Sequence, residues 1–189
     1  GTYNYAYVEP PYIPWVQPNS NHTKGVNDSI CWVTGNTEHD QDPFRLMSAM
    51  DVDDGATILT TNSFDLTTYK NPTVRYYRWY SNNAGQAPNQ DTLVVRVSSD
   101  GGNYWIDLER TTETIANWTP RVFKLNDYIT PTEDVIFQFI AEDASPGSLV
   151  EAAIDDFELL DYETGVSVED IITPNDVVLY QNYPNPFNP

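Results

Sequence analysis

The pattern of hydrophobic and polar residues predicts β-strands, most clearly between residues 73 and 109. Three runs rich in β-branched and aromatic residues, at 73–80, 91–98 and 104–109, are separated by a polar loop and a tight turn. The turn is Asp100-Gly101-Gly102, where glycine adopts at little cost the positive φ that a tight hairpin needs. We expect strands here, with a hairpin joining the second and third.

Further strand-like runs lie on both sides of this centre, at 29–34, 56–59, 117–123, 135–141 and 148–160. The run 29–34 is short and apolar, which predicts a buried strand, and 135–140 is almost continuously apolar, which predicts a central strand covered on both faces. Only residues 44–50 have the pattern of a helical turn or two. About eight short strands with turns rich in Asp, Asn and Gly predict an all-β fold, an antiparallel β-sandwich.

Alternation within 76–80 places Tyr76, Arg78 and Tyr80 on one face of a strand and Tyr77 and Trp79 on the other. One face must be core. The other is either an exposed aromatic platform for sugar rings or a further packing surface, and packing is the favoured interpretation. The candidates for a carbohydrate-binding surface are Trp15, Tyr80 and Trp118.

The two ends of the chain have a different composition. Tyrosines alternate with other residues near the start, and a short strand-like run lies near the end. We expect one or both tails to add as strands to a β-sandwich, of this copy or another, because an added strand gains backbone hydrogen bonds. The assembly candidates are Tyr3, Tyr5, Tyr7, Val177, Leu179 and Tyr180. The expected organisation is an extended tail (1–14), the sandwich (15–160), an acidic linker (161–176) and a terminal motif (177–189).

Acidic residues dominate the charge. The chain has 28 acidic and 9 basic residues, a net charge of −19, which argues against nucleic acid and anionic membrane as partners. No stretch approaches the ~18 apolar residues of a membrane helix. The plain interpretation of such acidity is a well-solvated surface; the alternative is cation binding.

A calcium site is the more specific hypothesis. Residues 51–54 hold three carboxylates, and Ca²⁺ takes carboxylate and carbonyl oxygens at such loop spacing, although EF-hand spacing is absent. The alternative is an exposed acidic turn. Acids also interrupt the apolar strand 148–160, where a charge needs a partner. The candidate Ca²⁺ ligands are Asp51, Asp53, Glu151, Asp155 and Asp156.

No catalytic constellation is visible. Cys31 is the single cysteine, lies among apolar residues and is expected to be a buried thiol. The two histidines, His22 and His39, lie in polar stretches, so no nucleophile–base pair is indicated. We expect no enzyme activity; the enzyme alternative is a glycoside hydrolase, which needs two carboxylates ~5–10 Å apart across a cleft.

Several segments together resemble the MAM-like, concanavalin-A-like jelly-roll domains of secreted bacterial proteins. They are 31–36, 51–59, 64–66, 77–82, 99–102 with Trp105, and 150–157. The resemblance implies a jelly roll with a structural calcium between an early loop and the last strand. The chain departs from the family pattern at Asp54 and in an insertion at 37–50, both of which touch the proposed metal loop.

Residues 179–189, Leu-Tyr-Gln-Asn-Tyr-Pro-Asn-Pro-Phe-Asn-Pro, are similar to the opening of the C-terminal sorting domain of the type IX secretion system. This implies a secreted or cell-surface protein of a Bacteroidetes-like bacterium. Ser29 and Thr92 then lie in triplets that resemble the O-glycosylation sites of such bacteria.

The expected function is a non-catalytic accessory or adhesive β-sandwich, stabilised by calcium, with a glycan as ligand. The alternative is a structural subunit of an extracellular filament or surface layer, whose partners are other copies of the chain.

Overall fold

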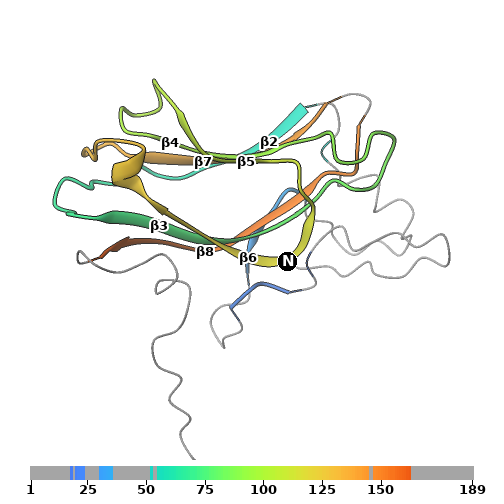
Figure 1. Cartoon of the computed structure of the whole chain (residues 1–189), viewed down its shortest axis with the longest axis horizontal. Helices are drawn as coiled ribbons and strands as arrows, with labels where there is room; N and C mark the ends of the chain where they lie inside the picture. Colours follow the sequence, from blue (N-terminus) through green and yellow to red (C-terminus); the bar gives the residue numbers. More distant parts are fainter. Residues whose placement is uncertain are drawn as a thin grey trace, which may run out of the picture.

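The computed structural model describes residues 18, 20–23, 30–35, 52, 55–144 and 147–162, which form two antiparallel sheets packed face to face (Figure 1). The strands are β1 (Trp32–Val33), β2 (Gly55–Thr60), β3 (Pro72–Ser81), β4 (Leu93–Ser98), β5 (Ile106–Thr111), β6 (Ile115–Lys124), β7 (Ile136–Asp143) and β8 (Glu151–Asp161). A 3₁₀ turn, η1 (Leu125–Asp127), follows β6.

Sheet A has the order β1-β8-β3-β6 and sheet B the order β2-β7-β4-β5, with all neighbours antiparallel. The predicted antiparallel β-sandwich is therefore confirmed. The predicted hairpin is confirmed as β4–β5, whose turn holds Gly101 and Gly102 at φ values of 68° and 91°. The predicted helical turns at 44–50 lie outside the described residues.

The core lies between the sheets and is built from alternate residues of each strand, including Val74, Val95, Phe137, Phe139 and Ile154. The prediction that 135–140 forms a central strand is correct, because β7 lies between β2 and β4. Its outward residues Ile136 and Gln138 are partly exposed, so the prediction that both faces are covered is wrong.

Strand β8 contains a β-bulge that changes which residues face inward. Its pairing with β3 shifts between Arg75 and Tyr77, and Asp156 adopts a positive φ of 48°. Ile154 and Phe157 therefore both pack in the core although strict alternation would put them on opposite faces. The bulge leaves Asp155 and Asp156 together at the outer side of sheet A.

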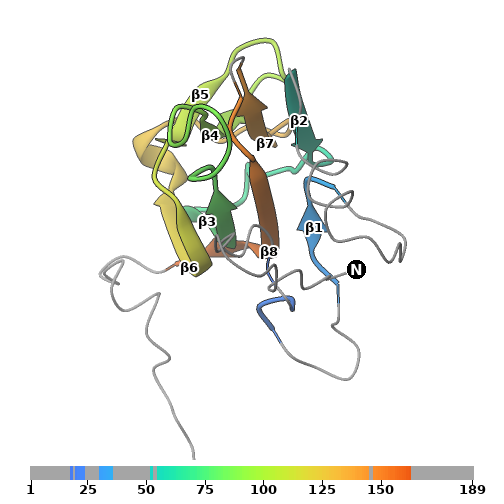
Figure 2. The same cartoon turned by 90° about the vertical axis from the view of Figure 1, so that its right-hand side faces the viewer.

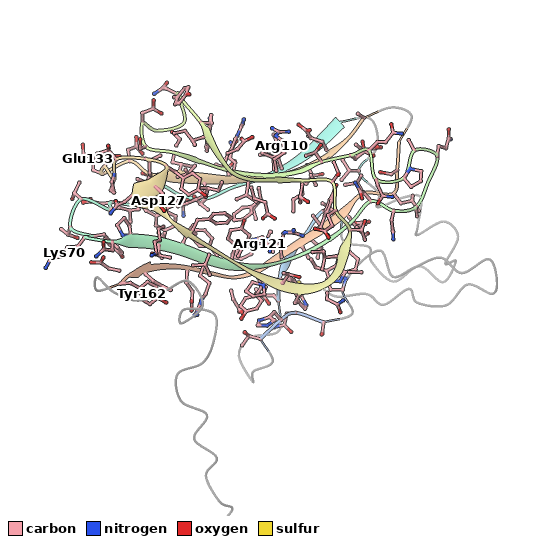
Figure 3. The ribbon with its side chains drawn as sticks, in the orientation of Figure 1. Lys70, Arg110, Arg121, Asp127, Glu133 and Tyr162 are labelled. Carbon is pink, nitrogen blue, oxygen red and sulfur yellow. The ribbon has the colours of Figure 1, made fainter. Side chains whose placement is uncertain are left out.

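One side of the sandwich, between β5 and β6, is closed by a buried charge network. Glu109 Oε1 accepts hydrogen bonds from Nε of Arg78 at 2.9 Å and Nε of Arg121 at 2.8 Å, and Oε2 accepts one from the Tyr76 hydroxyl at 3.0 Å. Arg121 points between the two sheets (Figure 3), and the Arg78 side chain is 0% exposed. Burial raises the pKa of Tyr76 well above its ordinary value, and the charge of Glu109 adds to this. The network thus joins sheet A to sheet B.

Candidate functional site

On the opposite side of the sandwich, the described residues form no such charge network. Sheet A ends there in β1 and sheet B in β2 (Figure 2), and two pockets lie between them, one of ≈ 40 Å³ and one of ≈ 270 Å³. Both pockets are lined by Trp32, Leu59, Phe139 and Ile154, so they form one continuous depression, which we call the Trp32 groove. The remaining lining residues are Val33, Thr34, Thr57, Thr60, Thr61, Asn62, Phe64, Leu93, Ala141, Ala152 and Phe157.

Trp32 is exposed at this groove because β1 is so short. The strand has two residues, and they pair with Ile154 and Ala153 of β8. A further backbone hydrogen bond, from Thr34 N to Ala152 O at 3.0 Å, anchors its end. Trp32 is 55% exposed, an unusual state for the side chain with the largest apolar surface. The indole therefore offers an exposed aromatic surface at the mouth of the groove.

The prediction that 29–34 forms a buried strand is wrong. Ile30 is 72% exposed and Trp32 is exposed as well, because this two-residue strand lies at the edge of its sheet, where pockets separate it from sheet B. The shortness of the apolar run was the signal available in the sequence for an exposed edge. The apolar neighbours of Trp32 predict a buried position, so the sequence did not indicate Trp32 as a functional residue.

Aromatic rings form the wall of the groove near β8. Phe157 lies 5.9 Å from Phe64 and 6.1 Å from Phe139, measured between ring centroids. These contacts tie β8 to sheet B and to the loop after β2, so the rings are held in place by their neighbours. The wall is therefore apolar and preformed.

The rim of the groove near β2 is polar. Thr60 Oγ1 accepts a hydrogen bond from Gln138 Nε2 at 3.1 Å, and Thr61 Oγ1 accepts one from the Phe137 N–H at 3.0 Å. The exposed Asn62 side chain makes no hydrogen bond to another described residue. No lining residue is charged, in a chain of net charge −19. This chemistry suits a neutral ligand that has an apolar face and hydroxyl groups.

Two of the predicted carbohydrate-binding residues, Tyr80 and Trp118, are described, and neither lines this groove. Tyr80 is 0% exposed, so its prediction as an exposed platform is wrong: alternation along β3 places it on the core face with Tyr76 and Arg78. Trp118 is partly exposed on the outer side of sheet A, where its Nε1 donates to Ser20 O at 2.9 Å. Trp118 thus helps to hold the segment 20–23.

The same outer side confirms that Tyr77 and Trp79 belong to a packing surface. The His22 ring stacks on Tyr77 at 3.5 Å between centroids, and Trp79 is 3% exposed. This face of β3 is therefore covered rather than open to a sugar.

Of the predicted calcium ligands, Glu151, Asp155 and Asp156 are described, and each accepts a hydrogen bond from a protein group. Asp155 Oδ2 accepts the His22 N–H at 2.7 Å, and Asp156 Oδ2 lies 2.6 Å from His22 Nδ1 and accepts from the Thr23 hydroxyl at 2.5 Å. Glu151, further along β8, accepts from the Thr34 hydroxyl beside β1. The described residues contain no group of three His, Cys, Asp or Glu side chains placed to hold a metal. Calcium binding stays a prediction.

Cys31 is half-buried, so the prediction of a buried thiol is met only in part. Burial raises its pKa to about 11, and the negative charge of Asp155 adds to this. A thiol that remains protonated at neutral pH is a poor nucleophile.

Other predicted residues bear less on the groove. Thr92 is partly exposed just before β4. No helix in the described ranges is long and apolar enough to cross a membrane. The following predicted residues lie outside the described part of the chain: Tyr3, Tyr5, Tyr7, Trp15, Ser29, Asp51, Asp53, Val177, Leu179 and Tyr180.

Comparison with known proteins leaves the family open. No protein-family model matches the sequence, and no curated protein matches it. Among solved structures, the chain is similar to the structure of TmCBM61 in complex with β-1,4-galactotriose, with 14% identity over 60% of this chain and 68% of that chain and a TM-score of 0.39. The resemblances to MAM-like domains and to the sorting domain stay predictions.

Proposed function

We propose that the chain is a non-catalytic carbohydrate-binding β-sandwich of a secreted or cell-surface protein, and that the Trp32 groove receives a neutral sugar. The observation that carries this proposal is the exposed indole of Trp32 beside an uncharged aromatic groove, with the exposed amide of Asn62 at its rim. The extracellular location is supported by the similarity of residues 179–189 to a sorting motif.

A sugar ring has the two properties that the groove matches. Its C–H face packs on an aromatic ring, and its hydroxyls need hydrogen-bond partners at fixed positions. Trp32 supplies the ring, and Asn62 with the Thr60 hydroxyl supplies donors and acceptors. The larger pocket, ≈ 270 Å³, is at the lower limit of the ~300–1,000 Å³ typical of small-molecule sites. We therefore expect the groove to hold a single ring of an oligosaccharide.

Isothermal titration calorimetry against a panel of neutral oligosaccharides, β-1,4-galactotriose among them, tests this proposal. Trp32→Ala should weaken binding of the best ligand about tenfold or more, equivalent to about 1.4 kcal/mol. Asn62→Ala should weaken it by a smaller factor. Tyr104→Ala is the matched control, because Tyr104 is also an exposed aromatic residue, 70% exposed, but lies in the β4–β5 turn. Equal affinity in Trp32→Ala and wild type would refute the proposal.

A further inference from the structure

The outer face of sheet B carries an arginine that forms no ion pair with a described carboxylate. Four of the five described arginines form ion pairs with carboxylates: Arg75 with Glu158, Arg78 and Arg121 with Glu109, and Arg110 with Asp107. Arg96 has no described carboxylate within ion-pair distance. With 28 acidic residues against 9 basic ones, a shortage of acids does not explain this.

Neutral groups hold the Arg96 guanidinium in place. Its Nε and Nη2 both donate to Gln138 Oε1, at 2.9 Å and 2.7 Å, and its Cζ lies 4.8 Å from the centroid of the Trp105 ring. Gln138 is itself oriented by its hydrogen bond to Thr60 Oγ1. A Cβ on Gly102 would lie 3.3 Å from Trp105 Cζ2, so the turn packs closely against the indole. The guanidinium is thus pre-organised by contacts with neutral groups and forms no ion pair with a described carboxylate.

The outward end of the guanidinium has donors to spare. Nη1 has no hydrogen-bond partner among the described residues, and Nη2 uses one of its two N–H groups on Gln138. These two nitrogens form the end-on fork that matches the two oxygens of a carboxylate. Arg96 is partly exposed, so a ligand can reach this fork.

A second arginine lies beside the first. In the backbone register of β4 and β5, Arg96 lies opposite Asp107 and Val94 lies opposite Arg110. Arg96 and Arg110 are therefore diagonal neighbours on the same outer face. Figure 3 shows Arg110 on the outer side of sheet B, away from the interior position of Arg121. The Arg110 side chain is 56% exposed and pairs with Asp107. These three groups give a local excess of one positive charge.

We propose that Arg96, stacked on Trp105 beside Arg110, binds the carboxylate of an acidic sugar, a uronic acid residue of a glycan. The choice of a sugar rests on the proposed carbohydrate-binding function, whereas the choice of a carboxylate rests on the free guanidinium fork. This second site lies on the outer face of sheet B and is separate from the Trp32 groove. The −19 charge of the chain does not prevent binding at 0.15 M salt, since exposed charges beyond ~8 Å are largely screened.

Titration of trigalacturonate and of neutral β-1,4-galactotriose into the whole chain at 0.15 M salt tests the second site. Arg96→Gln should weaken trigalacturonate binding about tenfold or more, and Arg96→Lys should also weaken it because an ammonium lacks the planar fork. Lys70→Gln is the matched control: it removes the same charge at an exposed lysine in the loop before β3 (Figure 3). It should leave the affinity unchanged.

The two proposals fail in different ways. Trp32→Ala should weaken binding of the neutral oligosaccharide about tenfold or more but spare trigalacturonate, and Arg96→Gln should do the reverse. If trigalacturonate binding is lost in Trp32→Ala and kept in Arg96→Gln, the second site is refuted while the groove stands. If Arg96→Gln and Lys70→Gln have equal effects, the attraction is non-specific and the second site is likewise refuted. Equal competition by a triglutamate peptide would overturn the assignment to a sugar.

Discussion

Replacing Glu109 with glutamine tests whether the charge network between β5 and β6 holds the two sheets together. Glutamine has nearly the same volume and keeps one acceptor oxygen, so the change removes a charge without opening a cavity. It leaves two guanidiniums facing each other. Arg121 has a side chain that is 27% exposed and can turn to water, but Arg78 is 0% exposed and cannot.

The cost follows from that burial. Removing one partner of a buried ion pair typically costs about 3–5 kcal/mol, because the other charge stays buried and uncompensated. We expect Glu109→Gln to lower the free energy of unfolding by about 3 kcal/mol, the low end, since the amide oxygen still accepts one hydrogen bond. For a domain of this size each kcal/mol lowers Tm by about 2–4 °C, which gives a fall of roughly 6–12 °C.

Urea denaturation followed by tryptophan fluorescence measures this loss. Arg121→Gln provides the comparison and should cost about 1 kcal/mol or less, because that guanidinium is partly solvated. The double variant Arg78→Met with Glu109→Gln should recover part of the lost stability, because it removes the buried charge of Arg78 that Glu109 no longer neutralises. A loss below about 1 kcal/mol for Glu109→Gln, or one equal to that of Arg121→Gln, would show that the network does not carry the stability assigned to it.

Two further predictions concern the Cys31 thiol and the predicted calcium site. A pKa raised from 9.0 to about 11 means that Cys31 should react with iodoacetamide at pH 8 about 100-fold more slowly than an ordinary thiol. Its stabilising effect is present below pH 9 and lost as the pH rises toward 11. Reaction at the rate of an ordinary thiol would contradict the partial burial of Cys31. For the predicted calcium site, EDTA should lower Tm and added Ca²⁺ should restore it, with Asp155→Asn insensitive to both; a wild-type melting curve that responds to neither rules the site out.

Strand positions could be predicted because they depend on local pattern. The β-branched and aromatic runs became β3, β4, β6 and β7, and alternation in β3 assigned the two faces correctly. The sequence could not tell which face was core, since the face bearing Arg78 is stable inside only because Glu109, from the other sheet, neutralises it. That pairing is a tertiary fact with no local signature.

The candidate sites were predictable to a smaller extent. Strict alternation fails within β8, where the bulge at Asp156 shifts the inward positions, so the acids there could not be placed on a face from sequence alone. The apolar neighbours of Trp32 predict a core position, whereas its exposure depends on how few residues of β1 pair with β8. Arg96 carried no signal in the sequence, because what distinguishes it is the absence of a described acidic partner in space.

The two sides of the sandwich differ in how they resist separation. Between β5 and β6 the sheets are joined by charge-assisted hydrogen bonds, whereas at the Trp32 groove they meet through apolar contacts beneath a two-residue strand. Fluctuations that separate the two sheets should therefore be smallest around Glu109 and largest at β1 and β2. Amide hydrogens of β1 and β2 should exchange with deuterium well before those around Glu109, and each opening widens access to Phe139 and Ile154 at the base of the groove.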